Sequence, residues 1–446
     1  MDLLLINPPY FEPQEMDERY QSHISWVRKG NMYVVPFEPP LGLASLAAFL
    51  KEKGITVELL DMPGQRMNEV QLRDFLLREK PGCIGITAMS STLFSALKIA
   101  SVTKSVLPEA KVMVGGVHPT IDPRAVLQNS DIDYVVRGEG EFVLESLFSF
   151  FSSQTLPEID GLCYRLDGEY VISKKAPLIT DINLLPLPDY SAFPIEAYVN
   201  YNENLRGIKG ISMLVSRGCP YRCTFCSVKS TMGTLYRIKS PGKVVDEMEF
   251  LRDNFNLEGI WFKDSILNLK HTWVNELCTE MKRRDLNLVW QCNSRVDLIQ
   301  EDEIKFMAQS GLIQLDLGIE SGSMRSLQVL KKEYTIDQVE RAVTIAKKYV
   351  KVAGFFMIGI PGETEKDIDE TFALAKTLKL DKYCFSMFIP LPGSELYDQL
   401  SAEGKIDKEN DLKDLHFTLC NKSFCEVRPE RLVEKYEEIN DYFSKN

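Results

Sequence analysis

Short apolar runs alternate with helical patterns along the first third of the chain. The apolar runs are rich in Val, Ile and Leu and have the length of strands. In chain order they are DLLLINPP, TVELLD, CIGITAM, KVMVGG and DYVVRG. After the first run, apolar residues recur at the spacing of one helix face, at Leu43, Leu46, Ala47 and Leu50. Strands separated by helices favour a parallel sheet covered on both faces, so residues 1–145 are predicted to form a doubly wound, Rossmann-like α/β domain.

The regular pattern fades in residues 146–205, where prolines and aromatic residues predict an ordered connector. A second series of strand-like runs then begins: ISMLVSR, EGIWFKD, LVWQCNSR, LIQLDLGIE, VAGFFMIGI and YCFSMFIP. Helical stretches separate these runs, so residues 206–400 are predicted to form a partial (β/α)6 TIM-like barrel with its site at the C-terminal ends of the strands. Residues 401–446 are mostly polar and helical and are predicted to form a short C-terminal extension.

Composition narrows the range of partners and compartments. The 446 residues carry a net charge of −12, which argues against a nucleic-acid partner because phosphate binding favours a basic face. No apolar run approaches the ~20 residues of a membrane span, and the first residues lack the basic region of a signal peptide. Ten cysteines are too sparse for a disulfide scaffold. We therefore expect a cytoplasmic protein whose clustered thiols hold metal or do chemistry.

Three cysteines lie close together in SRGCPYRCTFC, directly after the first predicted barrel strand. Their spacing is Cys219-x3-Cys223-x2-Cys226, which places them at the predicted mouth of the barrel. A zinc site closes with four ligands, and no histidine lies nearby in the sequence, so zinc would need a remote fourth ligand. A [4Fe–4S] cube on three thiolates leaves one iron open to a substrate or cofactor. Phe225 would give a flat ligand there an apolar wall.

The run CPYRCTFC resembles the CxxxCxΦC signature of the radical S-adenosylmethionine (SAM) enzymes. The resemblance implies that SAM binds the open iron and is cleaved by one electron to a 5′-deoxyadenosyl radical, which takes a hydrogen from the substrate. Later strand ends resemble SAM-contacting segments of that family, in GIWFKDS, CNSRVD, LGIESGS, MIGIPGET and FIPLPGSELY. By this resemblance the SAM-binding candidates are Phe225, Asp264, Asn293, Arg295, Glu320, Gly359 and Pro361.

Several of these candidates also have a structural interpretation. Asp264 can cap a helix, and Arg295 can pair with Asp297. The GIPGET run can be a turn that starts a helix, with Pro361 and Gly362 setting the backbone.

The first predicted domain resembles the cobalamin-binding domain that precedes the barrel in many radical SAM enzymes. The likeness lies in EPPLGLASLAAFL, GGVHPTIDP and DYVVRGEGE. The two halves together resemble the cobalamin-dependent, class B group. By this resemblance the cobalamin-binding candidates are Pro9, Tyr10, Ser90, Gly115, Gly116, His118, Gly138 and Glu139. They follow predicted strands, where a doubly wound sheet binds its ligand.

No D-x-H-x-x-G run is present, so no histidine is expected to replace the base of cobalamin on cobalt. We expect cobalamin to bind base-off, with His118 as a wall or loop residue. Residues 138–141 equally suit a structural turn into a helix. The domain could instead be a Rossmann-like fold that holds no cobalamin.

These resemblances imply methyl transfer from methylcobalamin to an unactivated carbon or phosphorus of a small molecule. The same radical would also serve a cyclisation, ring rearrangement or carbon–carbon coupling without methyl transfer. A non-catalytic corrinoid or metal carrier is the alternative from another class, and the SAM-like segments count against it. Methylthiotransferases need three more cysteines in the first domain, where only Cys83 and Cys163 precede the trio. The expected partners are the small-molecule substrate and an electron donor such as flavodoxin or ferredoxin, and no general acid or base is assigned.

Overall fold

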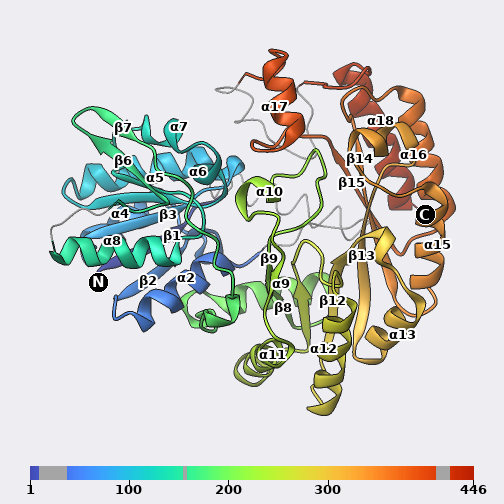
Figure 1. Ribbon diagram of the computed structural model, residues 1–446, viewed down its shortest axis with the longest axis horizontal. Helices are drawn as coiled ribbons and strands as arrows, with labels where there is room; N and C mark the ends of the chain where they lie inside the picture. Colours follow the sequence, from blue (N-terminus) through green and yellow to red (C-terminus); the bar gives the residue numbers. More distant parts are fainter. Residues whose placement is uncertain (10–37, 154–157, 408–421, 446) are drawn as a thin grey trace. The chain divides into compact units, whose positions relative to one another are not determined.

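The computed structural model of the chain describes residues 1–9, 38–153, 158–407 and 422–445 (Figure 1). By their internal contacts these residues form two compact units. The first unit contains the N-terminal strand, the described part of Glu38–Tyr198, and Ser227–Thr234. The second contains Val199–Cys226 and the described part of Leu235–Asn446. Each unit has a main sheet of its own.

Within the described residues, the sheet of the first unit has seven strands in the order β2-β1-β3-β4-β5-β6-β7. They are β1 (Leu3–Asn7), β2 (Val57–Asp61), β3 (Cys83–Thr87), β4 (Lys111–Gly115), β5 (Tyr134–Val136), β6 (Leu162–Leu166) and β7 (Glu169–Val171). The first five strands are parallel, which confirms the predicted doubly wound fold. β6 pairs antiparallel with β5 and with β7, so a hairpin that the sequence pattern did not predict extends one edge of the sheet.

Helices connect the parallel strands of this sheet (Figure 1). The described helices of the first unit are α2 (Leu41–Glu52), α3 (Met62–Gln65), α4 (Glu69–Glu79), η1 (Ser90–Thr92), α5 (Leu93–Val106), α6 (Val117–Ile121) and α7 (Pro123–Leu127), followed by α8 (Glu141–Ser153), η2 (Ile182–Leu184), η3 (Tyr190–Ala192) and α10 (Val228–Thr231), which lie beyond the parallel strands in the chain. α9 (Ile195–Arg206) begins in the first unit and ends in the second. Leu43, Ala47 and Leu50 are buried on one face of α2, as their spacing predicts.

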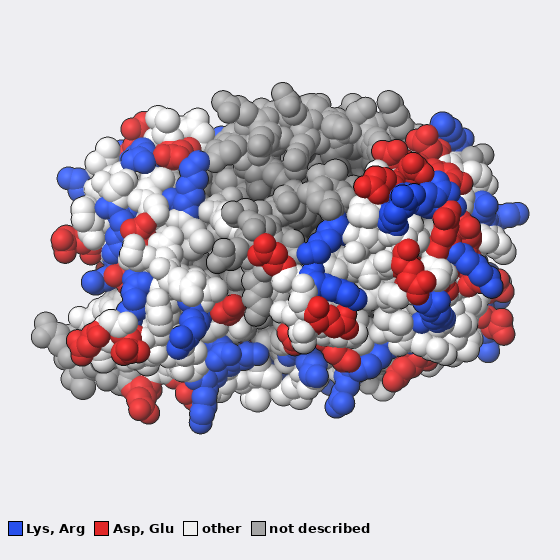
Figure 2. All heavy atoms as spheres, turned by 90° about the horizontal axis from the view of Figure 1, so that it is seen from above, with Lys and Arg blue, Asp and Glu red and all other residues white. Residues whose placement is uncertain are grey.

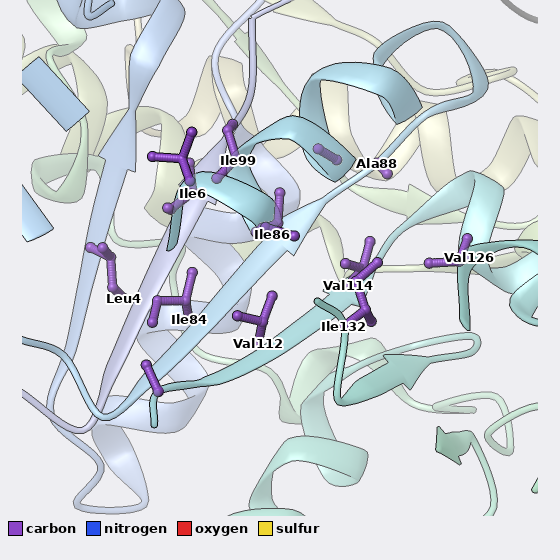
Figure 3. Close-up of a cluster of buried hydrophobic side chains, with 14 of the residues drawn as sticks. Leu4, Ile6, Ile84, Ile86, Ala88, Ile99, Val112, Val114, Val126 and Ile132 are labelled. Atoms are coloured by element: carbon purple, nitrogen blue, oxygen red, sulfur yellow. The ribbon is translucent and has the colours of Figure 1, made fainter. Parts of the chain in front are cut away.

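A core of aliphatic side chains covers one face of the parallel strands (Figure 3). Its labelled members include Leu4 and Ile6 of β1, Ile84 and Ile86 of β3, Val112 and Val114 of β4, and Ile99 of α5. Side chains alternate between faces along a strand, so Leu3 and Leu5 point to the opposite face. They are buried as well. A sheet buried on both faces explains why these strands read as continuous apolar runs.

Six parallel strands form the main sheet in the described part of the second unit, in the order β15-β14-β13-β12-β11-β8. They are β8 (Gly210–Met213), β11 (Gly259–Phe262), β12 (Val289–Ser294), β13 (Leu312–Glu320), β14 (Lys351–Ile358) and β15 (Lys382–Met387). The spatial order follows the chain order, and the sheet curls (Figure 1). This confirms the predicted partial (β/α)6 barrel. Two short strands, β9 (Ser216–Arg217) and β10 (Arg237–Ile238), follow β8 in the chain and pair antiparallel with each other in a separate sheet.

Helices alternate with the strands of this barrel. They are α11 (Pro241–Phe255), α12 (His271–Arg283), η4 (Val296–Leu298), α13 (Glu301–Gln309), α14 (Met324–Val329), α15 (Ile336–Ala346), α16 (Glu365–Leu378), α17 (Glu395–Ala402) and α18 (Pro429–Lys445). α18 lies along β15, where the Phe443 ring stacks on Tyr383 with 3.8 Å between ring centroids. The predicted helical C-terminal extension is therefore confirmed.

Charges of both signs lie on the face of the protein seen in Figure 2. On this face, Lys and Arg lie among Asp and Glu. Among the described helices, none is long and apolar enough to cross a membrane.

Candidate functional site

The three clustered cysteines lie in residues 218–226, called here the cysteine loop, which follows β8 and β9 at the C-terminal edge of the barrel sheet. Cys219, Cys223 and Cys226 are partly exposed, and none of them forms a disulfide. The loop begins at Gly218, whose φ of 81° suits glycine. The loop therefore brings three thiols to the predicted mouth of the barrel.

Thr224 anchors the middle of this loop. Its backbone N–H donates to Leu330 O at 3.2 Å and its hydroxyl donates to Val329 O at 2.7 Å, at the C-terminal end of α14. Its carbonyl accepts from the Leu396 N–H at 2.9 Å, at the start of α17. Helix ends leave such carbonyls and N–H groups without partners inside the helix, so Thr224 satisfies both ends at once. Sequence analysis did not predict this role.

Arg295 lies against the cysteine loop after β12. Its guanidinium carbon is 3.6 Å from the centroid of the Tyr221 ring, and Nη1 donates to Cys223 Sγ at 3.7 Å. Nε also pairs with Asp297 Oδ1 at 2.9 Å, as its structural interpretation predicts. The buried guanidinium is therefore held by an aromatic face and a carboxylate while it faces a thiol.

A second cation, Lys332, lies by the same loop. Its Nζ is 2.9 Å from Oε1 of Glu320, which ends β13 with a left-handed φ of 64°. The ammonium is 5.7 Å from the Phe225 ring centroid and 5.8 Å from that of Tyr334. Tyr334 donates its hydroxyl to Gly318 O at 2.7 Å. Sequence analysis missed Lys332 and Tyr334. For Lys332 the reason is that nothing in the local sequence indicates that a lysine is buried.

Charge and burial act in opposite directions on this group of side chains. Burial raises the pKa of the Cys219 thiol, while the Tyr221 backbone N–H and the charges of Arg295 and Lys332 partly offset the rise. Burial opposes the charge of Lys332, but Glu320, Tyr334 and Cys223 together outweigh burial and raise the pKa of the ammonium above its ordinary value. Cations beside the loop favour thiolates, the form in which cysteine binds iron.

Asp264 lies at the C-terminal end of β11 and is fully buried. Its Oδ1 accepts from the backbone N–H of Val215 at 3.0 Å, and from the N–H and hydroxyl of Ser216 at 2.5 Å each. Its Oδ2 has no hydrogen-bond partner among the described residues. Burial raises the pKa of this carboxyl to about 6. Asn293 Nδ2 donates to Asp264 O at 2.9 Å, so the two SAM-binding candidates are adjacent.

The GIPGET segment forms a tight turn between β14 and α16. Gly359 has a φ of 82°, and a Cβ there would lie 2.8 Å from a Leu432 methyl. The buried Glu363 carboxylate accepts from the N–H groups of Gly359 at 2.6 Å and Ile360 at 3.1 Å, and from Ser326 Oγ at 2.9 Å. Burial raises the pKa of Glu363 to about 7. Gly359 and Pro361 are therefore held in a fixed backbone shape, and their contact with SAM stays a prediction.

In the first unit, Ser90 and His118 form a buried pair at the C-terminal edge of the sheet. Ser90 Oγ lies 3.0 Å from His118 Nδ1, and His118 Nε2 has no hydrogen-bond partner among the described residues. Burial lowers the pKa of His118, and Asp122 offsets part of this effect. Gly116 has a φ of 109°, and a Cβ there would lie 2.9 Å from Ala88 O. Close packing between the ends of β3 and β4 therefore requires glycine.

Other cobalamin candidates lie at different places in this unit. Pro9 follows β1, and Tyr10 lies outside the described residues. Gly115 ends β4 and accepts from Ala88 N at 2.8 Å. The Gly138 N–H donates to Thr120 Oγ1 at 2.9 Å, whereas Glu139 accepts from the Ile179 N–H at 2.7 Å.

Glu139 also lines an open cavity of about 470 Å³, with Phe142 and Leu178 among the other lining residues. Neither Ser90 nor His118 lines that cavity. The structure therefore brings Ser90, Gly115, Gly116 and His118 together and gives Glu139 a structural contact.

Within the described ranges, no group of three His, Cys, Asp or Glu side chains is placed to hold one metal ion. Ligands of a single ion surround one centre, whereas three thiolates of a cube each bind a different iron. The finding therefore concerns single-ion sites and leaves the cysteine loop open to a cluster. The three thiols, the two cations and the aromatic rings around them fit that group.

Two protein-family models match the chain. One is described as a B12 binding domain and matches residues 32–148. The other is described as the radical SAM superfamily and matches residues 213–375. The first covers the Ser90–His118 pair, and the second covers the cysteine loop and all the SAM-binding candidates.

Several known proteins are similar to the chain over most of its length. A protein of Pyrococcus horikoshii described as an uncharacterized methyltransferase is 31% identical over 82% of this chain and 79% of its own. The anaerobic magnesium-protoporphyrin IX monomethyl ester cyclase of Rubrivivax gelatinosus is 31% identical over 82% of this chain and 67% of its own.

Among solved structures, the radical SAM methyltransferase TsrM of Kitasatospora setae, with cobalamin and a [4Fe–4S] cluster bound, has a TM-score of 0.73. The match has 20% identity and covers 90% of this chain and 78% of that one, so it supports the fold. Both halves of the resemblance in the sequence are thus found again in the family models. The chain belongs to the cobalamin-dependent radical SAM enzymes.

Proposed function

We propose that this enzyme transfers a methyl group from SAM, by way of cobalamin, to an unactivated carbon or phosphorus of a small molecule. The observation that carries the proposal is the likeness to the Pyrococcus horikoshii methyltransferase over most of both chains. A B12-binding and a radical SAM domain in one chain provide the two chemistries that such a reaction needs. The cofactors are a [4Fe–4S] cluster, SAM and cobalamin.

Cys219, Cys223 and Cys226 would hold the cluster. When bound, the cluster supplies the electron that cleaves SAM reductively. The protein holds the loop in place through Thr224 and surrounds it with positive charge from Arg295 and Lys332. This arrangement supports thiolate ligation at a defined position.

SAM would lie among the strand ends that carry Asp264, Asn293, Arg295, Glu320, Gly359 and Pro361, with Phe225 as an apolar wall. The unpartnered, buried Oδ2 of Asp264 is an acceptor suited to the ammonium of SAM. Asn293 donates to the Asp264 backbone and so orients its own amide oxygen. The Arg295 guanidinium would face the SAM carboxylate while it keeps its pair with Asp297.

Cobalamin would bind at the ends of β1, β3 and β4, where the strand order of the sheet reverses direction. Pro9, Ser90, Gly115, Gly116 and His118 lie at these ends. Gly138 and Glu139 make hydrogen bonds to Thr120 and Ile179, and Tyr10 stays a candidate outside the described residues. We keep the expectation of base-off binding without a histidine on cobalt, since the sequence has no D-x-H-x-x-G run.

The second candidate function is cyclisation or rearrangement without methyl transfer. The likeness to the Rubrivivax gelatinosus cyclase favours it, at the same identity but over a smaller share of that protein. We further propose a flavodoxin or ferredoxin as the electron donor and a cytoplasmic location, on the ground that the clustered thiols need a reducing compartment.

The fate of the SAM methyl group separates the two functions. Reduced, cobalamin-loaded enzyme is incubated with methyl-labelled SAM, first alone and then with candidate substrates. A methyltransferase is expected to move label to the bound corrinoid with release of S-adenosylhomocysteine, and then to form 5′-deoxyadenosine and labelled product in equal amounts. 5′-Deoxyadenosine without S-adenosylhomocysteine, and no label on the corrinoid, would contradict methyl transfer and favour the cyclase.

A further inference from the structure

Lys332 is a buried cation beside the cysteine loop. Its side chain is 6% exposed, and Glu320 is its partner in the ion pair. The preceding residue, Lys331, is 50% exposed and pairs with Glu395 at the surface. Removing an ammonium from water is unfavourable unless a partner compensates. Glu320 is that partner, so Lys332 keeps its charge in a buried place, whereas Lys331 lies at the surface.

The ammonium of Lys332 acts on the loop that would hold the cluster. It lies 5.7 Å from the ring of Phe225, which stands between Cys223 and Cys226 in the sequence. Because Phe225 adjoins Cys226 in the chain, an ammonium at this distance from the ring acts on a cluster held by the loop. Interactions between charges in a buried region are screened less than at the surface, so the effect persists over this range.

Arg295 adds a second positive charge next to Cys223, but its surroundings differ. It pairs with Asp297 and stacks on Tyr221, so it also holds the loop mechanically. Lys332 makes no hydrogen bond to the cysteine loop that the structure records. Its influence on the loop is therefore mainly electrostatic, which makes it the cleaner residue to test.

We propose that Lys332 raises the reduction potential of the [4Fe–4S] cluster on the cysteine loop, an inference that rests on the proposed cluster site. In the reduction, one electron passes from a low-potential donor, a flavodoxin or ferredoxin, to the cluster, and no bond forms or breaks. The thiolates make the site negative, and reduction makes it more so. A nearby buried cation stabilises the reduced form more than the oxidised form. Lys332 acts through the cluster and is a positioning residue.

The test compares Lys332→Met with the matched control Lys331→Met in the full-length, anaerobically reconstituted enzyme. Cluster reduction is followed by electron paramagnetic resonance during a dithionite titration without SAM. We expect the reduced-to-oxidised ratio of Lys332→Met to be about tenfold lower than that of the wild type at a fixed potential, which corresponds to a midpoint about 59 mV lower for one electron. Lys331→Met is expected to keep the wild-type midpoint.

A second variant predicts the opposite sign. Glu320→Gln removes the countercharge of Lys332, so the midpoint potential of the cluster in this variant is expected to rise. Wild-type iron content with an unchanged midpoint in Lys332→Met overturns the inference and leaves the cluster site intact. A wild-type protein without iron on these cysteines instead overturns the proposed function. If Lys332→Met holds no iron, the test depends on Glu320→Gln. A cluster midpoint in Glu320→Gln that is unchanged or lower than in the wild type then overturns the inference.

Discussion

Single polar residues in this protein are buried at strand ends, where each one depends on a few partners. His118 is an example. Its Nδ1 is engaged by Ser90 Oγ, its Nε2 lacks a described partner, and burial lowers its pKa. Folding therefore favours the neutral imidazole.

This pair predicts a pH dependence of stability. The unfolded chain binds a proton at His118 near the ordinary pKa of about 6.5, whereas the folded state binds it only at lower pH. Stability from this residue is present above that value and declines as the pH falls below it. We expect the melting temperature of the cofactor-free protein to fall more between about pH 7.5 and about pH 5.5 than that of His118→Gln. Equal falls in both proteins would contradict the prediction.

At this scale, sequence predicted residues that carry chemistry and missed residues that acquire a role through burial. The cysteine trio stands out by spacing, and Asp264 and Arg295 stand out by their position after strands. Lys332 and Thr224 look like ordinary polar residues in the sequence. Their burial depends on Glu320 and on the ends of α14 and α17, which only the folded chain brings near.

At the scale of elements, the cysteine loop depends on two helix ends. Thr224 donates to the last carbonyls of α14 and accepts from the first turn of α17. A buried carbonyl that loses its donor typically costs about 1–3 kcal/mol. The position of the three thiols is therefore coupled to contacts with Val329 and Leu396, which are more than one hundred residues away in the chain.

Thr224→Val removes the hydroxyl donor while it keeps the branched shape of the side chain. We expect the loop to be destabilised locally by about 1–2 kcal/mol, because Val329 O loses its buried donor. Iron per chain after reconstitution should fall, and chelators should remove iron faster. Thr279→Val is the control, since its hydroxyl bonds to Asn275 O within α12. Equal iron retention in both variants would show that Thr224 does not hold the loop.

Strands and helices were predicted correctly where the local sequence pattern marks them. The prediction failed where a strand is placed by pairing with a distant strand. The five parallel strands of the first unit and the six of the second read as separate apolar runs between helices. The hairpin β6–β7 did not, because its strands are partly exposed, and its place depends on antiparallel pairing of Cys163 with Val135. Such pairing with a distant strand leaves no period in the local sequence.

At the scale of the whole molecule, each unit has its own sheet and buried side chains. The alternation of strands and helices predicts both folds, and the family likeness assigns one cofactor chemistry to each. The family likeness indicates the type of reaction but does not identify the substrate. Substrate contacts are side chains of no fixed type, so neither periodicity nor spacing reveals them.

The separate cores predict that the two metal cofactors can be lost independently. Changing Cys219, Cys223 and Cys226 together to Ala should remove about four irons per chain and leave corrinoid binding, because the cobalamin candidates lie in the first unit. Gly116→Val should do the reverse, since its φ of 109° and the 2.9 Å approach of Ala88 O leave no room for a side chain. Iron and cobalt per chain, measured after anaerobic loading, test both variants. If the triple variant also lost its corrinoid while it kept a wild-type circular dichroism spectrum, the two sites would depend on each other, and binding of one cofactor would have to stabilise the other.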